Sequence, residues 1–204
     1  MPPKPKFTKE EIVQTALEVV SQKGAAALTA QELANALGSS ARPIFTVFRT
    51  MQEVQDAVRE AAMRRFETFA AQKLPDMPLF KQVGMQMVLF GAKEPKLYQL
   101  LFMQENRSAA SFDDVFGALG PTAQTCIELL QAQYDLSQPD ARRLFENVWI
   151  YTFGVAAAIA FGFSSALCAT RVCRFCEEAL GQMLTTEFQA MLRFVQAQNG
   201  KTEE

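Results

Sequence analysis

Apolar residues recur at intervals of three and four along nearly the whole 204-residue chain, and no stretch shows the sustained alternation typical of a β-strand. The pattern therefore predicts an all-α protein of about nine helices. The expected helices run over approximately 8–23, 29–37, 40–48, 51–72, 79–92, 95–106, 112–134, 138–164 and 168–198. Pro75 and Pro78 break the pattern after the fourth helix, and later prolines mark further helix starts or kinks.

The first predicted helix has clear start and stop signals. The Thr8 hydroxyl is placed to cap the amide of Glu11, while the Glu11 carboxylate can reach back to the Thr8 amide, as in a capping box. The helix is expected to end at Lys23 and Gly24, a cation followed by a residue that tolerates left-handed backbone geometry.

Two short helices joined by a tight turn come next. Thr29 is expected to cap the first, which Gly38 ends after barely two turns. The serines at 39–40 are expected to cap the second, with Pro43 in its first turn, where the missing N–H costs nothing. Helices this short must pack on their neighbours, which is how a helix-turn-helix is built. A plain helical hairpin within a larger bundle is the alternative.

The order of residues in this region resembles the N-terminal motif of the tetracycline-repressor (TetR, AcrR-like) family of transcriptional regulators. The matching positions are Leu28-Thr29, Leu33-Ala34, Leu37-Gly38, Ser40, Ile44-Phe45 and Phe48, after a first helix that ends in Lys23-Gly24. The resemblance covers about residues 8–58. It implies an N-terminal arm and DNA-binding domain in 1–50 and a helical effector-binding and dimerisation domain in 51–204, with 51–72 as the connecting helix.

The resemblance also implies which residues meet DNA. The helix over 40–48 would enter the major groove, with Arg42 donating to a guanine edge and Thr29 touching phosphate. The full expected set is Thr29, Ser40, Ala41, Arg42, Pro43, Phe45, Thr46 and Arg49. Three positions depart from the family, which commonly has Tyr in place of Phe45, His or Tyr in place of Val47, and Lys in place of Met51.

Gly154, Ala158 and Gly162 recur every four positions, a spacing that favours close helix packing. In the TetR family the last two long helices pair with their copies across a two-fold axis, so the resemblance implies a homodimer. The expected interface residues are Gly154, Ala158, Gly162, Leu180, Leu184, Phe188 and Met191. A role as internal core is the alternative for both helices.

Methionines and aromatic residues are frequent between the N-terminal motif and the last two helices. Such residues at helical spacing suit an internal core, and they also suit an adaptable pocket. By the family resemblance, the candidate pocket for an unknown small apolar or aromatic effector comprises Met87, Phe90, Leu101, Phe102, Glu105, Phe116, Trp149 and Tyr151.

Composition narrows the classes of function. The net charge is −2, and residues 1–50 carry a balance of +2 against −4 for the remainder, so DNA binding would depend on a local basic surface. The chain has no histidine, which excludes Ser-His and Cys-His nucleophiles, and it has no glycine-rich phosphate loop. We therefore expect no enzyme activity, cofactor or metal.

We expect instead a ligand-responsive repressor that binds a palindromic operator. A helical protein-interaction module that has lost DNA binding is the competing hypothesis.

Cellular location follows from two further features. The first residues lack the apolar stretch of a secretory signal, so we expect a cytoplasmic protein. The uncharged segment Val148–Ala169 is 22 residues long, enough for a membrane span, but Gly162 and the two serines at 164–165 interrupt it. We therefore expect no membrane association.

The four cysteines at positions 126, 168, 173 and 176 are expected to be reduced core thiols in such a compartment. Redox sensing by the Cys173 and Cys176 pair is the alternative.

Overall fold

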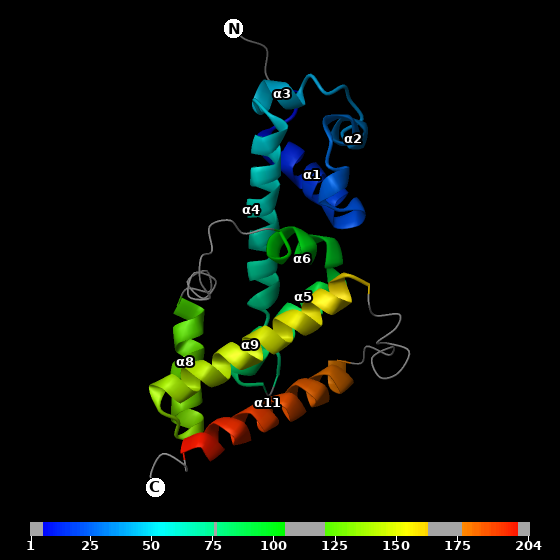
Figure 1. The fold of residues 1–204 in the computed structure, drawn as a ribbon. Helices are drawn as coiled ribbons and strands as arrows, with labels where there is room; N and C mark the ends of the chain where they lie inside the picture. The colour runs from blue at the N-terminus through cyan, green and yellow to red at the C-terminus, as the bar shows by residue number, and fades with distance from the viewer. Residues whose placement is uncertain (1–5, 76, 105–120, 163–176, 200–204) are drawn as a thin grey trace. The chain divides into compact units, whose positions relative to one another are not determined.

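The structure of the chain is a computed structural model, and it describes residues 6–75, 77–104, 121–162 and 177–199. Every regular element within these ranges is a helix (Figure 1). The predicted all-α fold is confirmed. The chain divides into two compact units. Unit 1 comprises Met1–Gln72 and Phe90–Gln104, and unit 2 comprises Lys73–Leu89 and Glu105–Glu204.

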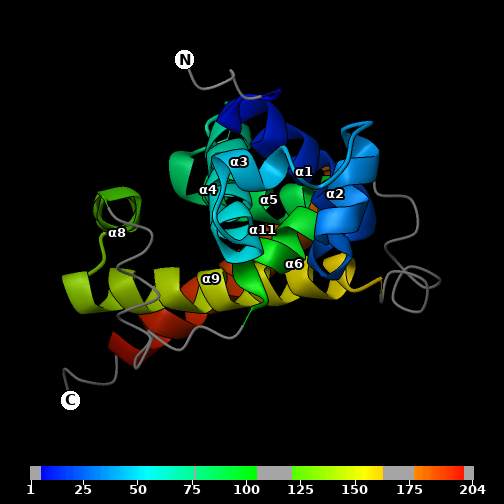
Figure 2. The same ribbon diagram turned by 90° about the horizontal axis from the view of Figure 1, so that it is seen from above.

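Unit 1 is built around two long helices, α1 (Lys9–Lys23) and α4 (Met51–Ala70), which lie side by side in Figures 1 and 2. The shorter elements of the unit are the 3₁₀ turn η1 (Ala25–Ala27), α2 (Ala30–Ala36), α3 (Ile44–Val47) and α6 (Pro95–Phe102). Helix α1 packs on α2, α4 and α6, and α6 also packs on α4. The two long helices thus support α2 and α6.

The capping box predicted at the start of α1 is present. The Glu11 amide donates to the Thr8 Oγ1 atom (3.1 Å), and the Thr8 amide donates to the Glu11 Oε2 atom (2.8 Å). Helix α1 ends at Lys23, and Gly24 follows with a φ of 87°. Such a cap contributes about 1 kcal/mol to helix stability, so it fixes where the supporting helix of unit 1 begins.

A polar network joins three helices of unit 1. The Arg65 guanidinium on α4 donates to the carboxylate of Glu94, the N-cap residue of α6, and the Ser21 hydroxyl on α1 donates to the same carboxylate (2.9 Å). At the other end of α6, the Arg59 guanidinium donates to the carbonyl oxygens of Leu100 (2.8 Å) and Leu101 (3.1 Å). Both ends of α6 are therefore held by arginines of α4.

Aromatic packing joins α4, α6 and the last turn of the helix Leu79–Lys93 (α5), which also belongs to unit 1. The Phe66 ring of α4 lies edge-on to Phe90 and Phe102, with ring centroids 5.1 and 5.0 Å apart. Phe69 also meets Phe90 (5.5 Å), and buried Tyr98 meets Phe102 (5.0 Å). Edge-on aromatic pairs contribute about 0.5–1.5 kcal/mol beyond their buried area, which makes this cluster a main part of the core of unit 1.

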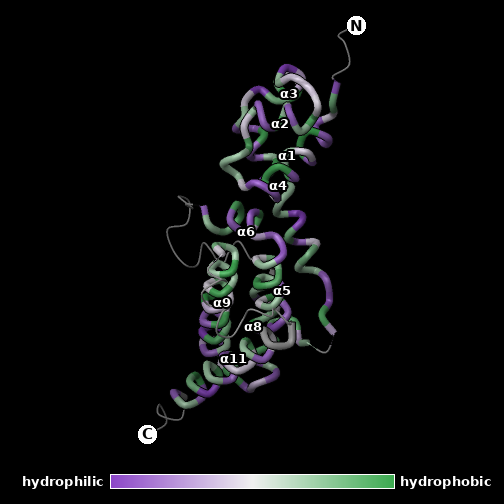
Figure 3. The backbone as a smooth tube through the Cα atoms, turned by 90° about the vertical axis from the view of Figure 1, so that its right-hand side faces the viewer, coloured by the Kyte–Doolittle hydropathy of each residue, from purple (hydrophilic) through white to green (hydrophobic). Residues whose placement is uncertain are grey.

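Unit 2 contains α8 (Pro121–Tyr134), α9 (Gln138–Ala160), α11 (Glu177–Asn199) and the larger part of α5 (Leu79–Lys93), whose last turn belongs to unit 1. Helix α9 packs on both α8 and α11, and Figure 1 shows α9 and α11 running side by side. Figure 3 shows in green the hydrophobic stretches of α5 and α9. Both helices contribute buried side chains, among them Val88 of α5 and Leu144 of α9.

Three aromatic rings join α5, α8 and α11 within unit 2. Phe80 lies 5.3 Å from Phe188 and 6.0 Å from Tyr134, and Tyr134 lies 5.5 Å from Phe188, between ring centroids. Burial raises the pKa of Tyr134 above its ordinary value. The rings fix the spacing of these helices on one side of the unit.

The C-terminal ends of α6 and α9 lie about four residues before the predicted ones. Helix α6 stops at Phe102 rather than near 106, and α9 stops at Ala160 rather than near 164. Gly162 adopts a φ of 77°, a left-handed conformation that ends α9. The predicted starts of the helices over 112–134 and 168–198 lie outside the described residues. No helix in the described ranges is long and apolar enough to cross a membrane.

Candidate DNA-binding surface and ligand cavity

The α2–α3 hairpin is held by one side-chain cap and a glycine turn. The Glu32 amide donates to the Thr29 Oγ1 atom at 3.1 Å, so Thr29 caps α2 as predicted. Gly38 has a φ of 59°, which most residues with a side chain disfavour. Leu33 and Ala34 are buried. They anchor α2 in unit 1, where α2 packs on α1.

The start of α3 differs from the prediction. Its N-cap is Pro43, which makes no side-chain cap hydrogen bond, and not one of the serines at 39–40. The amides of Ile44 and Phe45 instead donate to the carbonyl oxygen of Ala41 (3.1 and 3.4 Å), because a tight turn precedes the helix. The Ser39 hydroxyl is used elsewhere, as the acceptor for the Lys6 ammonium at 3.0 Å.

Helix α3 buries one face and exposes the other. Ile44 is fully buried and Phe48 nearly so, and these two residues anchor the helix in the core. The opposite side and the flanking residues form a surface that we call the reading surface. Its exposed members are Ser40, Arg42, Phe45, Thr46 and Arg49. The Phe45 ring is 45% exposed, which is unusual for a phenylalanine and means that a large apolar group is displayed there.

Two cations of the reading surface are available to a partner. Within the described ranges, no carboxylate forms an ion pair with the guanidinium of Arg42 or Arg49. Lys23, by contrast, is paired with Glu32 at 2.5 Å. Unpaired guanidinium groups beside exposed hydroxyls can donate to phosphate oxygens and to base edges.

The structure gathers the predicted DNA-contact residues on the α2–α3 hairpin. Six of the eight side chains are exposed, and Ala41 and Pro43 are half-buried. The eight positions lie at the N-cap of α2, in the turn before α3, in α3 itself and at Arg49, the second residue after α3 ends.

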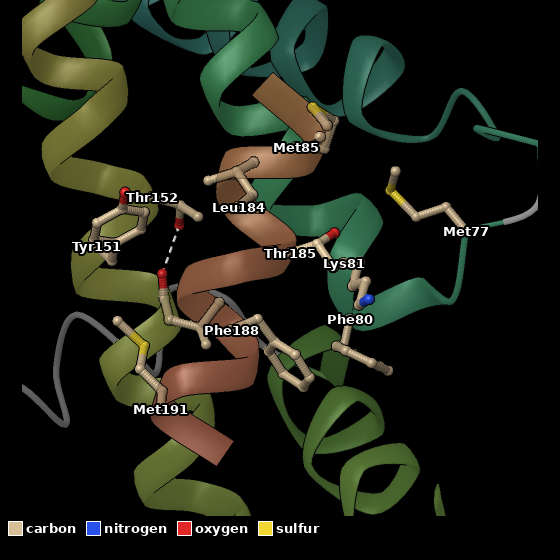
Figure 4. Close-up of a pocket in the computed structure, with 13 residues that line it drawn as sticks. Met77, Phe80, Lys81, Met85, Tyr151, Thr152, Leu184, Thr185, Phe188 and Met191 are labelled. Carbon is tan, nitrogen blue, oxygen red and sulfur yellow. Dashed lines mark hydrogen bonds between the residues drawn. The ribbon is translucent and has the colours of Figure 1, made fainter. Parts of the chain in front are cut away.

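A cavity lies in unit 2 between α5, α9 and α11 (Figure 4). Its volume is about 30 Å³, which is room for about one water molecule. Most of the wall is apolar, and it includes three methionines and two glycines. The lining residues are Met77, Phe80, Lys81, Gly84, Met85, Val148, Tyr151, Thr152, Gly181, Leu184, Thr185, Phe188 and Met191.

The polar side chains of the cavity wall differ in whether their hydrogen-bonding groups are already used within the protein. The buried Thr152 hydroxyl already donates to the carbonyl oxygen of Val148 at 2.9 Å. Burial, together with the charge of Glu187, raises the pKa of Tyr151 above its ordinary value, so this phenol stays neutral and can donate. The Lys81 ammonium lies 5.3 Å from the centroid of the Phe188 ring. Among the residues described as lining the cavity, Lys81 has the one charged side chain.

The structure assigns the predicted effector-pocket residues to different places. Phe90, Leu101 and Phe102 belong to unit 1, where the two phenylalanines join its aromatic cluster. In unit 2, Met87 and Trp149 are buried without lining the cavity, and Tyr151 lines it. Glu105 and Phe116 lie outside the described residues.

The predicted dimer residues also divide into groups. Leu184, Phe188 and Met191 of α11 line the cavity, and Phe188 is only 3% exposed, so these side chains face the interior of their own chain. Gly154 and Gly162 are exposed, and Ala158 is half-buried. The side chain of Leu180 lies outside the described residues.

Exposed apolar side chains that sequence reasoning did not single out lie on the same two helices. Ile150 of α9 is 55% exposed, Phe161 at the end of α9 is 61% exposed, and Phe194 of α11 is 53% exposed. Periodicity alone could not separate them from the core, because α9 and α11 have apolar residues on more than one face. The cavity-lining glycines, Gly84 and Gly181, left a clearer signal, since a glycine inside a helical pattern usually has a packing reason.

Comparison with known proteins gives a consistent result. No family model matches the chain, and no curated protein sequence matches it. Solved structures do match. A glutamine-to-alanine variant of TetR from Acinetobacter baumannii AYE, in complex with minocycline, is 17% identical, with a TM-score of 0.55 over 93% of this chain and 99% of that one. A transcriptional regulator from Rhodococcus sp. Rha1 is 16% identical, with a TM-score of 0.60 over 92% of this chain and 97% of that one. The chain therefore has the all-helical fold of TetR-type transcriptional regulators, as the N-terminal motif indicated.

Proposed function

We propose that this protein is a DNA-binding transcriptional regulator that reads its site through α3. The observation that carries the proposal is the exposure of the reading surface: Ile44 and Phe48 are buried beneath it, while Arg42 and Arg49 have no carboxylate partner among the described residues. A short helix anchored by its apolar face can present its outer face to the major groove. Arg42 would donate to a guanine edge, and Arg49 to phosphate.

The one aromatic ring among the exposed members of the reading surface, that of Phe45, suits base contact of a second kind. Phe45 has no hydroxyl to donate to phosphate, but its exposed ring can contact the methyl group of thymine. The Thr46 hydroxyl is less free than its exposure suggests, because it donates to the carbonyl oxygen of Arg42 at 3.1 Å. We therefore assign specificity chiefly to Arg42 and Phe45.

The protein acts as a homodimer in this proposal. The exposed side chains of Ile150, Phe161 and Phe194 support it, because large apolar groups concentrated on two adjacent helices favour association. Two copies related by a two-fold axis would read a palindrome, with their recognition helices about 34–36 Å apart or a multiple of that distance. Binding at a promoter would then repress transcription by excluding the polymerase.

Ligand response is the third part of the proposal. The cavity between α5, α9 and α11 supports it, as does the likeness to a TetR variant that was solved with minocycline. A ligand that prefers one conformation of the dimer would shift the population toward it, by as much as its affinities for the two states differ. The effector would thereby release or strengthen DNA binding.

Selection from a random pool of DNA duplexes tests the proposal. The full-length protein should enrich a palindromic sequence over successive rounds, and Arg42→Ala should enrich it less or with a changed base at the contacted position. If the protein enriches no sequence and retains no duplex on the support, it does not bind DNA. The fold would then serve as a helical protein-interaction module.

A further inference from the structure

We propose that the cavity between α5, α9 and α11 binds a carboxylate with a slender, flexible apolar tail, of the kind found in an unbranched fatty acid. The proposal names a ligand class for the ligand response proposed above and rests on it. Three features of the cavity wall carry it: one cation without a carboxylate partner, methionines that can move, and a narrow space between fixed walls.

The cation is Lys81, which is half-buried at the wall of the cavity. Its ammonium lies over the Phe188 ring, 5.3 Å from the centroid, and no carboxylate in the described ranges pairs with it. A partly desolvated ammonium is stabilised by an anion that displaces the remaining water. The wall of the cavity therefore favours a ligand with one negative charge.

The negative charge of Glu187 determines which way round the ligand would lie in the cavity. Glu187 of α11 interacts electrostatically with Tyr151, another lining residue. A carboxylate head would be repelled from that part of the wall and attracted to Lys81. The tail of the ligand would then lie among the methionines and Leu184.

The methionines determine what shape of tail can enter. A volume of about 30 Å³ is too small for any tail, so side chains must move. Met77, Met85 and Met191 are unbranched and have several rotatable bonds, which lets them vacate a channel of their own width. A Cβ atom built on Gly181 would lie 3.4 Å from the Met85 Cε atom, so the end of Met85 covers this glycine. Rotation of Met85 would open a strip over the backbone of α11.

The other residues of the cavity wall cannot move aside as the methionines can, because they are closely packed. Gly84 and Thr152 hold α5 and α9 in close contact, since a Cβ atom built on Gly84 would lie only 2.9 Å from the Thr152 Cγ2 atom. The rings of Phe80 and Phe188 are packed with Tyr134. The channel is consequently narrow, which favours an alkyl chain over a broad ring system.

Isothermal titration of the full-length protein with dodecanoate, below its micelle concentration, tests the proposal. Dodecanoate should bind, and dodecyltrimethylammonium, which has the same tail and the opposite charge, should bind at least about ten-fold more weakly. Lys81→Gln should weaken dodecanoate binding by about ten-fold or more, while Lys81→Arg should keep it. Lys93→Gln is the matched control, because Lys93 likewise lies over a ring, that of Phe69 (5.4 Å), but belongs to unit 1.

A second pair of variants tests the channel. Gly181→Ala should weaken the binding of dodecanoate more than that of hexanoate. The added methyl group would fill part of the strip over α11 that Met85 vacates, and only the longer tail needs that strip. Met85→Ala should strengthen dodecanoate binding. Equal melting temperatures for Lys81→Gln and the natural protein would show that the substitution leaves the fold intact.

Three results would overturn the proposal: no heat of binding with dodecanoate, equal affinity for the cationic amphiphile, or no effect of Lys81→Gln. The titration contains no DNA, so its outcome does not depend on whether the reading surface binds a duplex. Failure of the ligand proposal and failure of the DNA-binding proposal are therefore distinguishable.

Discussion

Gly84 of α5 lies against Thr152 of α9 so closely that a Cβ atom built on the glycine would come within 2.9 Å of the Thr152 Cγ2 atom. The other Thr152 side-chain atoms would stay 3.6 Å away, which is ordinary contact. A single methyl group of Thr152 thus decides whether α5 can carry a side chain at this position.

The first prediction concerns this contact. Gly84→Ala should lower the free energy of unfolding by about 1–3 kcal/mol, because overpacking forces α5 and α9 apart. In a Thr152→Ser background the same substitution should be neutral or stabilising by about 0.5–1 kcal/mol, since alanine favours a helix more than glycine does. Urea denaturation of the four proteins of this cycle measures both values. An equal loss of stability in both backgrounds would contradict the assigned clash.

The second prediction concerns the polar network of unit 1. Arg65→Gln should destabilise the protein by about 1–2 kcal/mol, because Glu94, whose side chain is only 16% exposed, would lose its cationic partner. The neighbouring Arg64 serves as the control. Its side chain is 66% exposed and its pair with Glu60 spans 3.9 Å, so Arg64→Gln should change stability by less than about 0.5 kcal/mol. Thermal unfolding followed by circular dichroism would compare them, and equal effects would sink the assigned role of Arg65.

A pH dependence follows from the buried Cys126 thiol. Burial raises the pKa of Cys126 from 9.0 to about 11. The folded state keeps this proton where the unfolded state releases it, so the contribution to stability is present below pH 9 and is lost as the pH rises from about 9 to about 11. The stability of the natural protein should fall relative to that of Cys126→Ala by about 1–3 kcal/mol over this window. Urea denaturation at a series of pH values checks it, and a constant difference would show that the thiol does not titrate as described.

The fourth prediction concerns association. Ile150→Glu should weaken the proposed homodimer by about 100-fold or more, because a charge would be buried in an apolar interface. Leu129→Glu is the matched control, since Leu129 is also exposed (39%) but lies on α8. Sedimentation equilibrium of the two variants measures the dissociation constants. If both variants remain dimers, or if the natural protein is a monomer, α9 does not form the interface.

Much of the fold could be predicted from local signals. Thr8 and Thr29 cap their helices as the sequence indicated, because an N-cap depends only on residues three positions apart. The start of α3 could not be predicted in the same way. Two serines stood at the expected position, but the turn set by Gly38 and closed on the Ala41 carbonyl oxygen places Pro43 at the cap instead.

The candidate sites show the same division. The predicted DNA-contact residues lie together, since they are neighbours in the sequence on one hairpin. Most residues that line the cavity were not predicted as pocket residues, and Tyr151 is the one predicted pocket residue that the structure places on its wall. The cavity combines side chains from three helices, and which of their surfaces face one another depends on tertiary packing. Phe188 illustrates the difficulty: its helical position suited an interface, yet the rings of Phe80 and Tyr134 cover it within the chain.

The two arginines of the reading surface should differ in their effect on DNA binding. Arg42→Ala should reduce the preference for the selected palindrome over a scrambled duplex by about 10- to 100-fold, because a base contact is lost. Arg49→Ala should weaken binding to both duplexes alike and reduce the salt dependence by about one phosphate contact. Competition binding with both duplexes would separate the roles. Identical behaviour of the two variants would mean that neither arginine reads a base.

The central claim is that α3 carries a DNA-reading surface, and the most direct measurement is a fluorescence-anisotropy titration of the selected duplex at increasing salt. The account predicts that the dissociation constant rises steeply with salt, with a linear slope on a double-logarithmic plot. Binding at low salt should be tight, and the scrambled duplex should bind more weakly throughout. No binding to either duplex at low salt, or an affinity that does not change with salt, would contradict it.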